Sequence, residues 1–399
     1  MTEKRLPHLV TDTDDFLNDP ASALGCPRSR LGESRYGVEI FSYELARAAF
    51  HDRRMTPRNV DYFAARGASP LILEFIREGN LNFMAPEKHD RVRAVLGKAF
   101  TRTRIEDFRP VMQAIADDLI EGFIGRGECD LVADFCHLYP ISIFAQFMGV
   151  PATDVPIFAE ATVQLRMLGQ VPFGPGIPAL EAALSLLRDY VSRLVAERRA
   201  DPRDGFVDAL IALQDAGEKI SEEELIWGLV FLLLAGHDTT RFTLANLFHS
   251  LIRFGLWDDV AAHPERAPDA VAESMRIRPG TPRQIRVVAE SFEMDGHRLQ
   301  VDDVVSLNLA AAGQDPESFE AASEFRLSRD PAYLIGFGWG RHICLGQLLA
   351  KTEMAVAVVA VTDAITAVEL TAPCRTKPTG VIGGFDSLPV RFEPRGARR

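Results

Sequence analysis

A glycine-rich loop that delivers one cysteine to the start of a helix constrains this chain more than any other feature. The loop covers residues 337–346, has the sequence FGWGRHICLG and carries Cys344, and the pattern at 347–356 indicates a mostly buried helix. The glycines let the backbone approach a bulky partner because they have no Cβ. A cysteine at a helix N-terminus faces free amides and the positive end of the dipole, which favour a thiolate able to hold a soft metal. The alternative is a buried free cysteine in a turn.

Composition and charge exclude several classes of protein. The 399 residues are 47% hydrophobic and 25% charged, as in ordinary globular domains. The net charge of -12 argues against a nucleic-acid partner, which requires a basic face. The N-terminal segment 1–15 contains no apolar core, and the apolar run at 225–236 is shorter than the roughly 20 residues that span a bilayer. The sequence therefore predicts a protein with no membrane anchor.

The cysteines argue for a reducing, cytoplasmic location. They are few, odd in number and irregularly spaced, unlike a disulfide framework. The five are Cys26, Cys129, Cys136, Cys344 and Cys374.

The expected secondary structure is mostly helical. Residues 43–51 predict a helix, 57–79 a loop with weak helical pieces, and 279–296 a short strand. A capping box at Ser221 opens the longest expected helix, roughly 222–254. The glycine-rich segment 380–390 predicts a hairpin.

The middle of that long helix breaks the local rules of sequence. Its apolar run changes abruptly to Ala-Gly-His-Asp-Thr-Thr at 235–240. Glycine costs about 1 kcal/mol relative to alanine inside a helix, and an aspartate in apolar surroundings is expensive unless it is paired. One interpretation is a kinked helix whose polar residues face solvent. The other is a groove for a small ligand, with Asp238 and Thr239 adjacent for proton delivery.

Two further segments carry charges at helical spacing. His89 and Arg93 lie four apart, and Glu273 and Arg276 lie three apart, so each pair shares a helix face. Each pattern alone also fits a solvated surface or a surface ion pair. Around His89 the charge is strongly basic, which suits an acidic partner. Between 88 and 104 there is one acid, Asp90, and the basic residues are Lys88, Arg91, Arg93, Lys98, Arg102 and Arg104.

Four elements, near residues 90, 238, 273 and 344, resemble the cytochrome P450 family in their order along the chain. The cysteine loop matches the haem-ligand motif at every fixed position, and 235–239 resembles the oxygen-binding helix. One departure is at 313–316, where Gly-Gln-Asp-Pro replaces the common Asn-Arg-Asp-Pro. The resemblance implies a haem b cofactor (iron protoporphyrin IX) with Cys344 as the axial ligand of the iron.

The resemblance also implies roles for other residues. The cofactor-binding set is His89, Arg93, Ala235, Gly236, Arg286, Phe337, Gly338, His342, Cys344 and Gly346, of which His89, Arg93, Arg286 and His342 would hold the propionates. Asp238 and Thr239 would be catalytic. Glu273 and Arg276 would be structural. By position in the family pattern, the substrate-facing residues are Phe231, Leu234, Ala235, Pro282, Val381 and Ile382.

The implied fold is mainly α, a single large helical domain over 1–399 with a small β-rich lobe. The implied function is a bacterial-type soluble haem-thiolate monooxygenase that hydroxylates an apolar small molecule with O2. A thiolate ligand donates electron density to haem iron and favours O–O cleavage. Two electrons would come from NAD(P)H through a ferredoxin reductase and an acidic ferredoxin, because the chain has no flavin or nucleotide motif. That ferredoxin would dock on Arg91, Lys98, Arg102, Arg341 and Lys351.

Two alternatives have the same fold. A peroxide-driven peroxygenase would need no electron partner, but enzymes of that kind typically lack the acid–alcohol pair at 238–239. A non-catalytic haem-thiolate sensor would need no proton delivery and would consume no oxygen in response to substrate.

Overall fold

The structure is a computed structural model that describes residues 5–25, 28–170, 173–174, 176–330, 334–377 and 380–396. Cys26 lies outside these ranges. The helices are α1 (Asp14–Asn18), α2 (Pro20–Leu24), α3 (Tyr43–Ala49), α4 (Val60–Ala64), α5 (Pro70–Glu78), α6 (Pro86–Ala99), α7 (Arg102–Asp107), α8 (Arg109–Ile124), α9 (Leu138–Met148), α10 (Val155–Leu165), α11 (Ile177–Ala200), α12 (Phe206–Asp215), α13 (Glu222–Ala235), α14 (Asp238–Arg253), α15 (Trp257–Ala262), α16 (Ala267–Ile277), α17 (Leu309–Gly313) and α18 (Gln347–Ala364).

The strands are short and gather into small sheets. They are β1 (Leu31–Ser34), β2 (Gly37–Ile40), β3 (Met55–Thr56), β4 (Glu128–Asp130), β5 (Arg283–Val288), β6 (Phe292–Met294), β7 (His297–Leu299), β8 (Val304–Asn308), β9 (Ile365–Leu370), β10 (Arg375–Lys377), β11 (Gly384–Ser387) and β12 (Pro389–Pro394). The largest sheet has the order β1-β2-β8-β5-β3, in which β2 and β8 are parallel and the other neighbours antiparallel.

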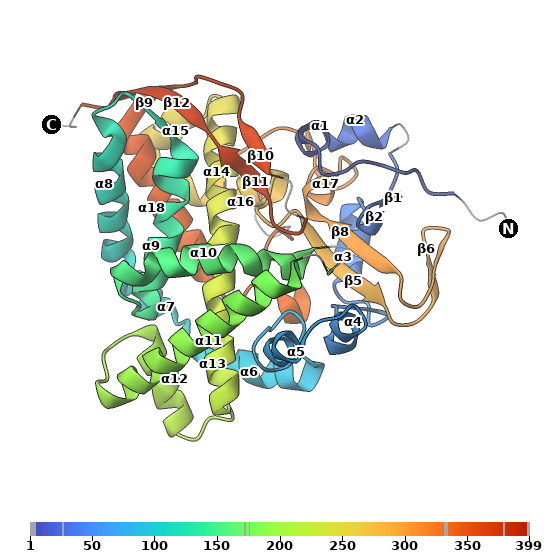
Figure 1. Cartoon of the computed structure of the whole chain (residues 1–399). Helices are drawn as coiled ribbons and strands as arrows, with labels where there is room; N and C mark the ends of the chain where they lie inside the picture. The colour runs from blue at the N-terminus through green and yellow to red at the C-terminus, as the bar shows by residue number, and fades with distance from the viewer. Residues whose placement is uncertain are drawn as a thin grey trace.

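Helices and sheet occupy different sides of the molecule (Figure 1). The helices α13 and α14 run one after the other through its middle, with α8, α9 and α18 on one side and β2, β8 and β5 on the other. The apolar residues divide in the same way: one large cluster joins the helices, and a smaller one joins the five-stranded sheet to α3. The predicted fold class, mainly α with a small β-rich lobe, is confirmed. Among the described residues, no helix combines the length and apolar character that crossing a bilayer requires.

The prediction of one continuous helix over 222–254 is wrong. Its start is confirmed, because Ser221 and Glu224 form the expected capping box. The helix breaks at Gly236 and His237, and His237 has φ -123° and ψ -44°. The ring of Phe144 packs against the backbone at Gly236, where a Cβ would lie 2.4 Å from it. Glycine also lowers helix stability by about 1 kcal/mol relative to alanine, so this position favours a break.

Two other local predictions need correction, whereas the expected strand at 279–296 is confirmed as β5. Residues 70–78 form the regular helix α5, because Ser69 caps its first turn and Pro70 suits the first helical position. The prediction of a hairpin over 380–390 is wrong, because its two strands do not pair with each other. Strand β11 pairs with β10, whereas β12 joins β4 and β9 in another sheet.

Candidate functional site

The cysteine loop turns back on itself and presents Cys344 at the start of α18. Gly338 and Gly340 have φ of 75° and 68°, left-handed conformations that favour glycine. The amide of Cys344 donates to the carbonyl of Phe337 at 2.8 Å and closes the loop. Two residues further, Gly346 is the N-cap of α18 and its amide donates to the Cys344 sulfur.

The Cys344 thiol faces an internal space. The residue has accessible surface, yet burial is the largest influence on its pKa. Both properties hold for a side chain that lines a hollow within the protein. The Gly346 amide at the start of α18 lowers the pKa of the thiol, which is the direction that the sequence predicted. Burial raises the pKa of the thiol and outweighs the opposing effects of the Gly346 amide and the Arg93 guanidinium. A metal ion would reverse the direction, since a coordinating thiol is deprotonated.

Basic side chains from three elements surround this space. The rings of His89 on α6 and His342 in the loop lie 4.3 Å apart. Burial lowers the pKa of His342 to about 3, helped by the positive charges of His89, Arg286, Arg341 and Arg93. The Arg93 guanidinium also acts on Cys344. The structure therefore brings together the four residues expected to hold propionates, although they come from positions 89 to 342.

The donors of this cluster lack acceptors, which fits a haem. The Nε2 atom of His89 is buried and has no hydrogen-bond partner, while its Nδ1 contacts Asp90 at 3.0 Å. Arg286 is 5% exposed, no described carboxylate pairs with it, and its Nη1 donates to the Ile285 carbonyl at 3.0 Å. An iron protoporphyrin offers two carboxylates for such donors and an iron for a thiolate. The residues present therefore fit the group.

The break between α13 and α14 exposes one strip of an otherwise buried pair of helices. Leu234, Ala235, Gly236 and Thr239 are half-buried, whereas their neighbours on both sides are buried. The hydroxyl of Thr239 donates to the Ala235 carbonyl at 3.2 Å and satisfies a group that the break leaves free. The strip contains two of the residues predicted to bind cofactor and one of the two predicted to be catalytic. Phe231, also predicted to face substrate, is buried.

Asp238 is fully buried and held by an arginine that the sequence did not single out. Arg166, which follows α10, donates hydrogen bonds to both carboxylate oxygens of Asp238. Burial alone would raise the pKa of Asp238, but the charges of His237 and Arg166 outweigh it and hold the pKa below its usual value. His237 itself bonds Thr162 at 3.2 Å. No sequence pattern pointed to Arg166, because it lies 72 residues from Asp238.

Gly280 joins α14 to the segments predicted to face substrate. Its amide donates to the Thr243 hydroxyl at 3.2 Å, and that hydroxyl donates to the Thr239 carbonyl at 2.7 Å. The Gly280 carbonyl accepts from the amide of Gly383 at 3.0 Å. A Cβ at Gly280 would lie 2.4 Å from the Thr239 carbonyl oxygen, so the two chains touch. Of the predicted substrate-facing residues nearby, Pro282 is buried, and Val381 and Ile382 are half-buried.

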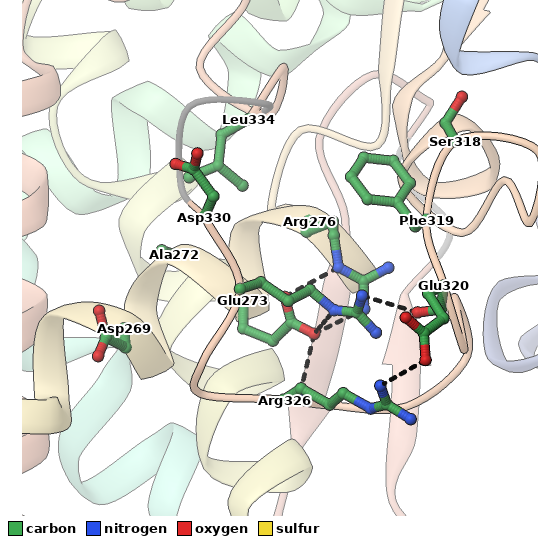
Figure 2. A pocket seen from close by; sticks show the side chains of 11 residues that line it. Asp269, Ala272, Glu273, Arg276, Ser318, Phe319, Glu320, Arg326, Asp330 and Leu334 are labelled. Atoms are coloured by element: carbon green, nitrogen blue, oxygen red, sulfur yellow. Dashed lines mark hydrogen bonds and ion pairs between the residues drawn. The ribbon is translucent and has the colours of Figure 1, made fainter.

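Glu273 and Arg276 form a buried ion pair beside a pocket of about 230 Å³ (Figure 2). Arg276 also donates to the carbonyls of Gly313, Ala322 and Glu324. Its guanidinium thus ties α16 to the irregular segment that precedes the cysteine loop. The pocket contains neither Cys344 nor any residue of α13 or α14. Its lining of paired charges indicates a structural junction, and the chemistry lies elsewhere.

Fewer cations of the predicted docking face are unpaired than the sequence indicates. Arg91 pairs bidentately with Glu224, at 2.6 and 2.8 Å. The other two pairs are Lys98 with Glu218, and Arg341 with Asp90. Arg102 and Lys351 are exposed, and no described acid lies within ion-pair distance of either. Acids that are remote in sequence therefore neutralise three of the five expected cations.

Comparisons with known proteins agree with this geometry. The Cytochrome P450 family model matches residues 267–363. Putative cytochrome P450 YjiB of Bacillus subtilis is 32% identical over 317 residues, which cover 77% of this chain and 79% of that protein. Mycinamicin IV hydroxylase/epoxidase of Micromonospora griseorubida is 31% identical over 336 residues, 81% of each chain. The crystal structure of CalO2 shares the fold, with a TM-score of 0.88 at 24% identity, covering 98% of this chain and 100% of that one. The chain therefore belongs to the cytochrome P450 family and is a haem b-dependent monooxygenase.

Proposed function

We propose that the protein hydroxylates a mainly apolar small molecule, with electrons from an acidic ferredoxin-type partner that a NAD(P)H-dependent reductase supplies. Haem, when bound, supplies the activation of O2, which protein side chains cannot perform. The observation that carries the proposal is the cluster of cations around Cys344, in which Nε2 of His89 lacks an acceptor among the described residues, together with the accessible strip that includes Thr239.

Cofactor binding would rest on one sulfur and four cations. Cys344 would be the axial ligand, and His89, Arg93, Arg286 and His342 would hold the propionates. An anionic acceptor at Nε2 of His89 would favour the imidazolium, because Nδ1 already contacts Asp90. Gly236 and Gly338 would belong to the wall of the cofactor site. The remaining wall residues of this set are Ala235, Phe337 and Gly346.

Asp238 and Thr239 would deliver protons. The Asp238 carboxylate is charged and paired with Arg166, and it would relay protons towards the Thr239 hydroxyl on the next residue of α14. The Thr239 hydroxyl donates to the Ala235 carbonyl on the exposed strip. It would be the polar group that donates a proton on that side of the site.

The substrate would be held mainly by apolar contacts. The side chains of Phe231, Leu234, Pro282, Val381 and Ile382 offer no charge, so affinity would follow buried apolar area at about 25 cal/mol per Å². The electron donor would meet Arg102 and Lys351. Attraction between exposed charges weakens as salt shortens the Debye length, so turnover at limiting ferredoxin should fall with ionic strength.

The test is reconstitution with a ferredoxin, its reductase and NAD(P)H across terpenes, steroids, fatty acids and aromatics. A spin-state shift of the haem identifies a ligand, and ¹⁸O from O2 in the product identifies a monooxygenase. Thr239→Ala should keep the spin-state shift and divert electrons to peroxide, whereas Thr239→Ser should retain product. Turnover with peroxide alone, at the rate of the full system, would instead indicate a peroxygenase. Ligand binding without substrate-dependent oxygen consumption would indicate a sensor.

A further inference from the structure

Arg58, two residues after β3, is a buried cation without a carboxylate. The residue is 3% exposed. Its Nη1 atom donates to the carbonyl of Gln170 at 3.1 Å, and its Nε atom is buried and has no partner in the part of the chain that the structure describes. The Tyr62 hydroxyl is the other polar group that acts on it, and the nearby charge of Arg66 is positive. No acidic side chain in the described parts of the chain pairs with this guanidinium.

The other buried arginines show how unusual this is. Removing a charge from water costs several kcal/mol unless a partner compensates. In the described ranges seven arginines are less than 10% exposed, and five of them lie within 4 Å of a described carboxylate. These five are Arg198 with Asp208, Arg241 with Asp386, Arg276 with Glu273, Arg278 with Asp14 and Arg283 with Glu39. The two exceptions are Arg58 and Arg286, and a haem propionate accounts for Arg286.

The surroundings of Arg58 stabilise its charge only in part. Its guanidinium carbon lies 5.5, 5.4 and 5.2 Å from the ring centroids of Tyr62, Phe63 and Phe83. Contacts at such distances contribute about 0.5–2 kcal/mol each. They satisfy none of the guanidinium's five N–H donors, whose geometry matches a carboxylate. Burial accordingly lowers the pKa of Arg58.

Arg58 is connected to the proposed substrate site through the segment that contains Gln170. Its acceptor Gln170 follows Gly169, whose backbone is so close to Val381 that a Cβ there would meet that side chain at 2.4 Å. Phe83, one of the three rings, precedes α6, which carries His89 and Arg93. The groups that act on the charge of Arg58 are Tyr62 and Arg66, and none of the four residues of the propionate cluster is among them.

We propose that Arg58 binds the carboxylate of a mainly apolar organic acid that is the substrate of this enzyme. This inference rests on the proposed function and narrows its substrate class. The acid's apolar body lies along the Val381 segment, while its carboxylate accepts from the free N–H groups of Arg58. The aromatic rings exclude water from the ion pair and strengthen it.

The binding test uses acids with matched neutral analogues. The probes are dodecanoic acid and adamantane-1-carboxylic acid, each with its primary amide, titrated into the holoenzyme at pH 8. Calorimetry and the haem spin-state shift give the dissociation constants. A charge-assisted pair should make the better acid roughly 10- to 100-fold tighter than its amide. If neither acid binds more tightly than its amide, the proposal is overturned.

Three variants assign the preference to Arg58. Arg58→Met should bring the ratio of acid to amide affinity close to one, and Arg58→Lys should retain part of it. Arg66→Met is the matched control, since Arg66 is exposed and lies over the same Tyr62 ring, 3.7 Å from its centroid. It should keep the full preference. An unchanged preference in Arg58→Met refutes the assignment. If that variant does not fold, Arg58→Lys carries the test: a ratio as high as that of the wild type counts against the proposal.

Melting curves separate binding from a structural role. An unpaired buried charge destabilises, so Arg58→Met holoprotein should melt no lower than the wild type without ligand. Acid should raise the melting temperature of the wild type and not that of the variant. If ligand-free Arg58→Met melts several degrees below the wild type, the aromatic rings already compensate the charge of Arg58. That result would count against a need for a bound anion. Arg58-dependent binding of acids without product would support the acid site and refute hydroxylation. Product formed from amides at the same rate as from acids would support hydroxylation and refute the acid site.

Discussion

The cysteine side of the site and the side formed by α13 and α14 are built in opposite ways. Around Cys344 the defining contacts are local: its amide reaches Phe337 within the same loop, and the amide of Gly346 reaches its sulfur. Around Asp238 they are remote. Arg166 is 72 residues away, and Gly280 lies 37 residues from the Thr243 that it contacts.

This difference explains what each side requires of the fold. A loop closed by its own backbone needs only glycines at two positions with positive φ. The helix side needs an ion pair and a hydroxyl bridge that form only when α10, α14 and the segment at 280 have all packed. We therefore expect changes on the cysteine side to abolish chemistry with little loss of stability. Changes on the helix side should affect stability and chemistry together.

The largest expected effect is that of Cys344→Ser. A serine oxygen cannot supply the electron donation of a thiolate, so the thiolate-type spectrum of the reduced carbon monoxide complex should vanish. Stability of the apoprotein should stay within about 1 kcal/mol of the wild type, because the loop is closed by backbone contacts. Cys136→Ser is the control, since that thiol is buried away from the loop. It should lower stability and keep the spectrum. An unchanged spectrum in Cys344→Ser would remove the basis of the assigned ligand.

The same division decides how much the sequence could predict. The fold class, the cysteine loop and β5 followed from contiguous patterns. The break at Gly236 did not, because an isolated glycine is also tolerated inside a continuous helix. The docking face was overestimated because the acid paired with Arg91 lies 133 residues away. Arg58 was not found at all: in the sequence it is one arginine among several, and only burial distinguishes it.

A smaller but still large effect is expected from Arg166→Met. It would leave Asp238 buried without its bidentate partner, and breaking such a pair costs about 3–5 kcal/mol. The folded pKa of Asp238 is lowered, so its stabilising contribution is present above the unfolded value and is lost as pH falls. The deficit of the variant should therefore be full at pH 7 and shrink in acid.

Denaturant titrations of variant and wild type from pH 7 down to about pH 2 measure that deficit. Arg126→Met is the matched control, because Arg126 pairs with Asp134 at 2.8 Å on the exposed surface. Its loss should cost at most about 1 kcal/mol. Turnover should fall in Arg166→Met as well, since the altered acid is part of the proposed proton path. A deficit equal to that of the control would mean that the buried pair contributes no more than a surface pair.

The smallest effect, and the sharpest test of the comparison, is expected from Thr243→Val. Valine keeps the shape of threonine but removes the hydroxyl that joins the Gly280 amide to the Thr239 carbonyl. The buried amide left without an acceptor should cost about 1–3 kcal/mol. Because Gly280 also accepts from Gly383, the turn carrying Val381 and Ile382 should lose its fixed distance from α14. Products should then form at more than one carbon of the same substrate, with a normal thiolate-type spectrum. Thr243→Ser retains the hydroxyl and should restore both stability and a single product. Equal behaviour of the valine and serine variants would mean that packing alone positions the turn, and that the helix side depends less on remote polar contacts than its geometry indicates.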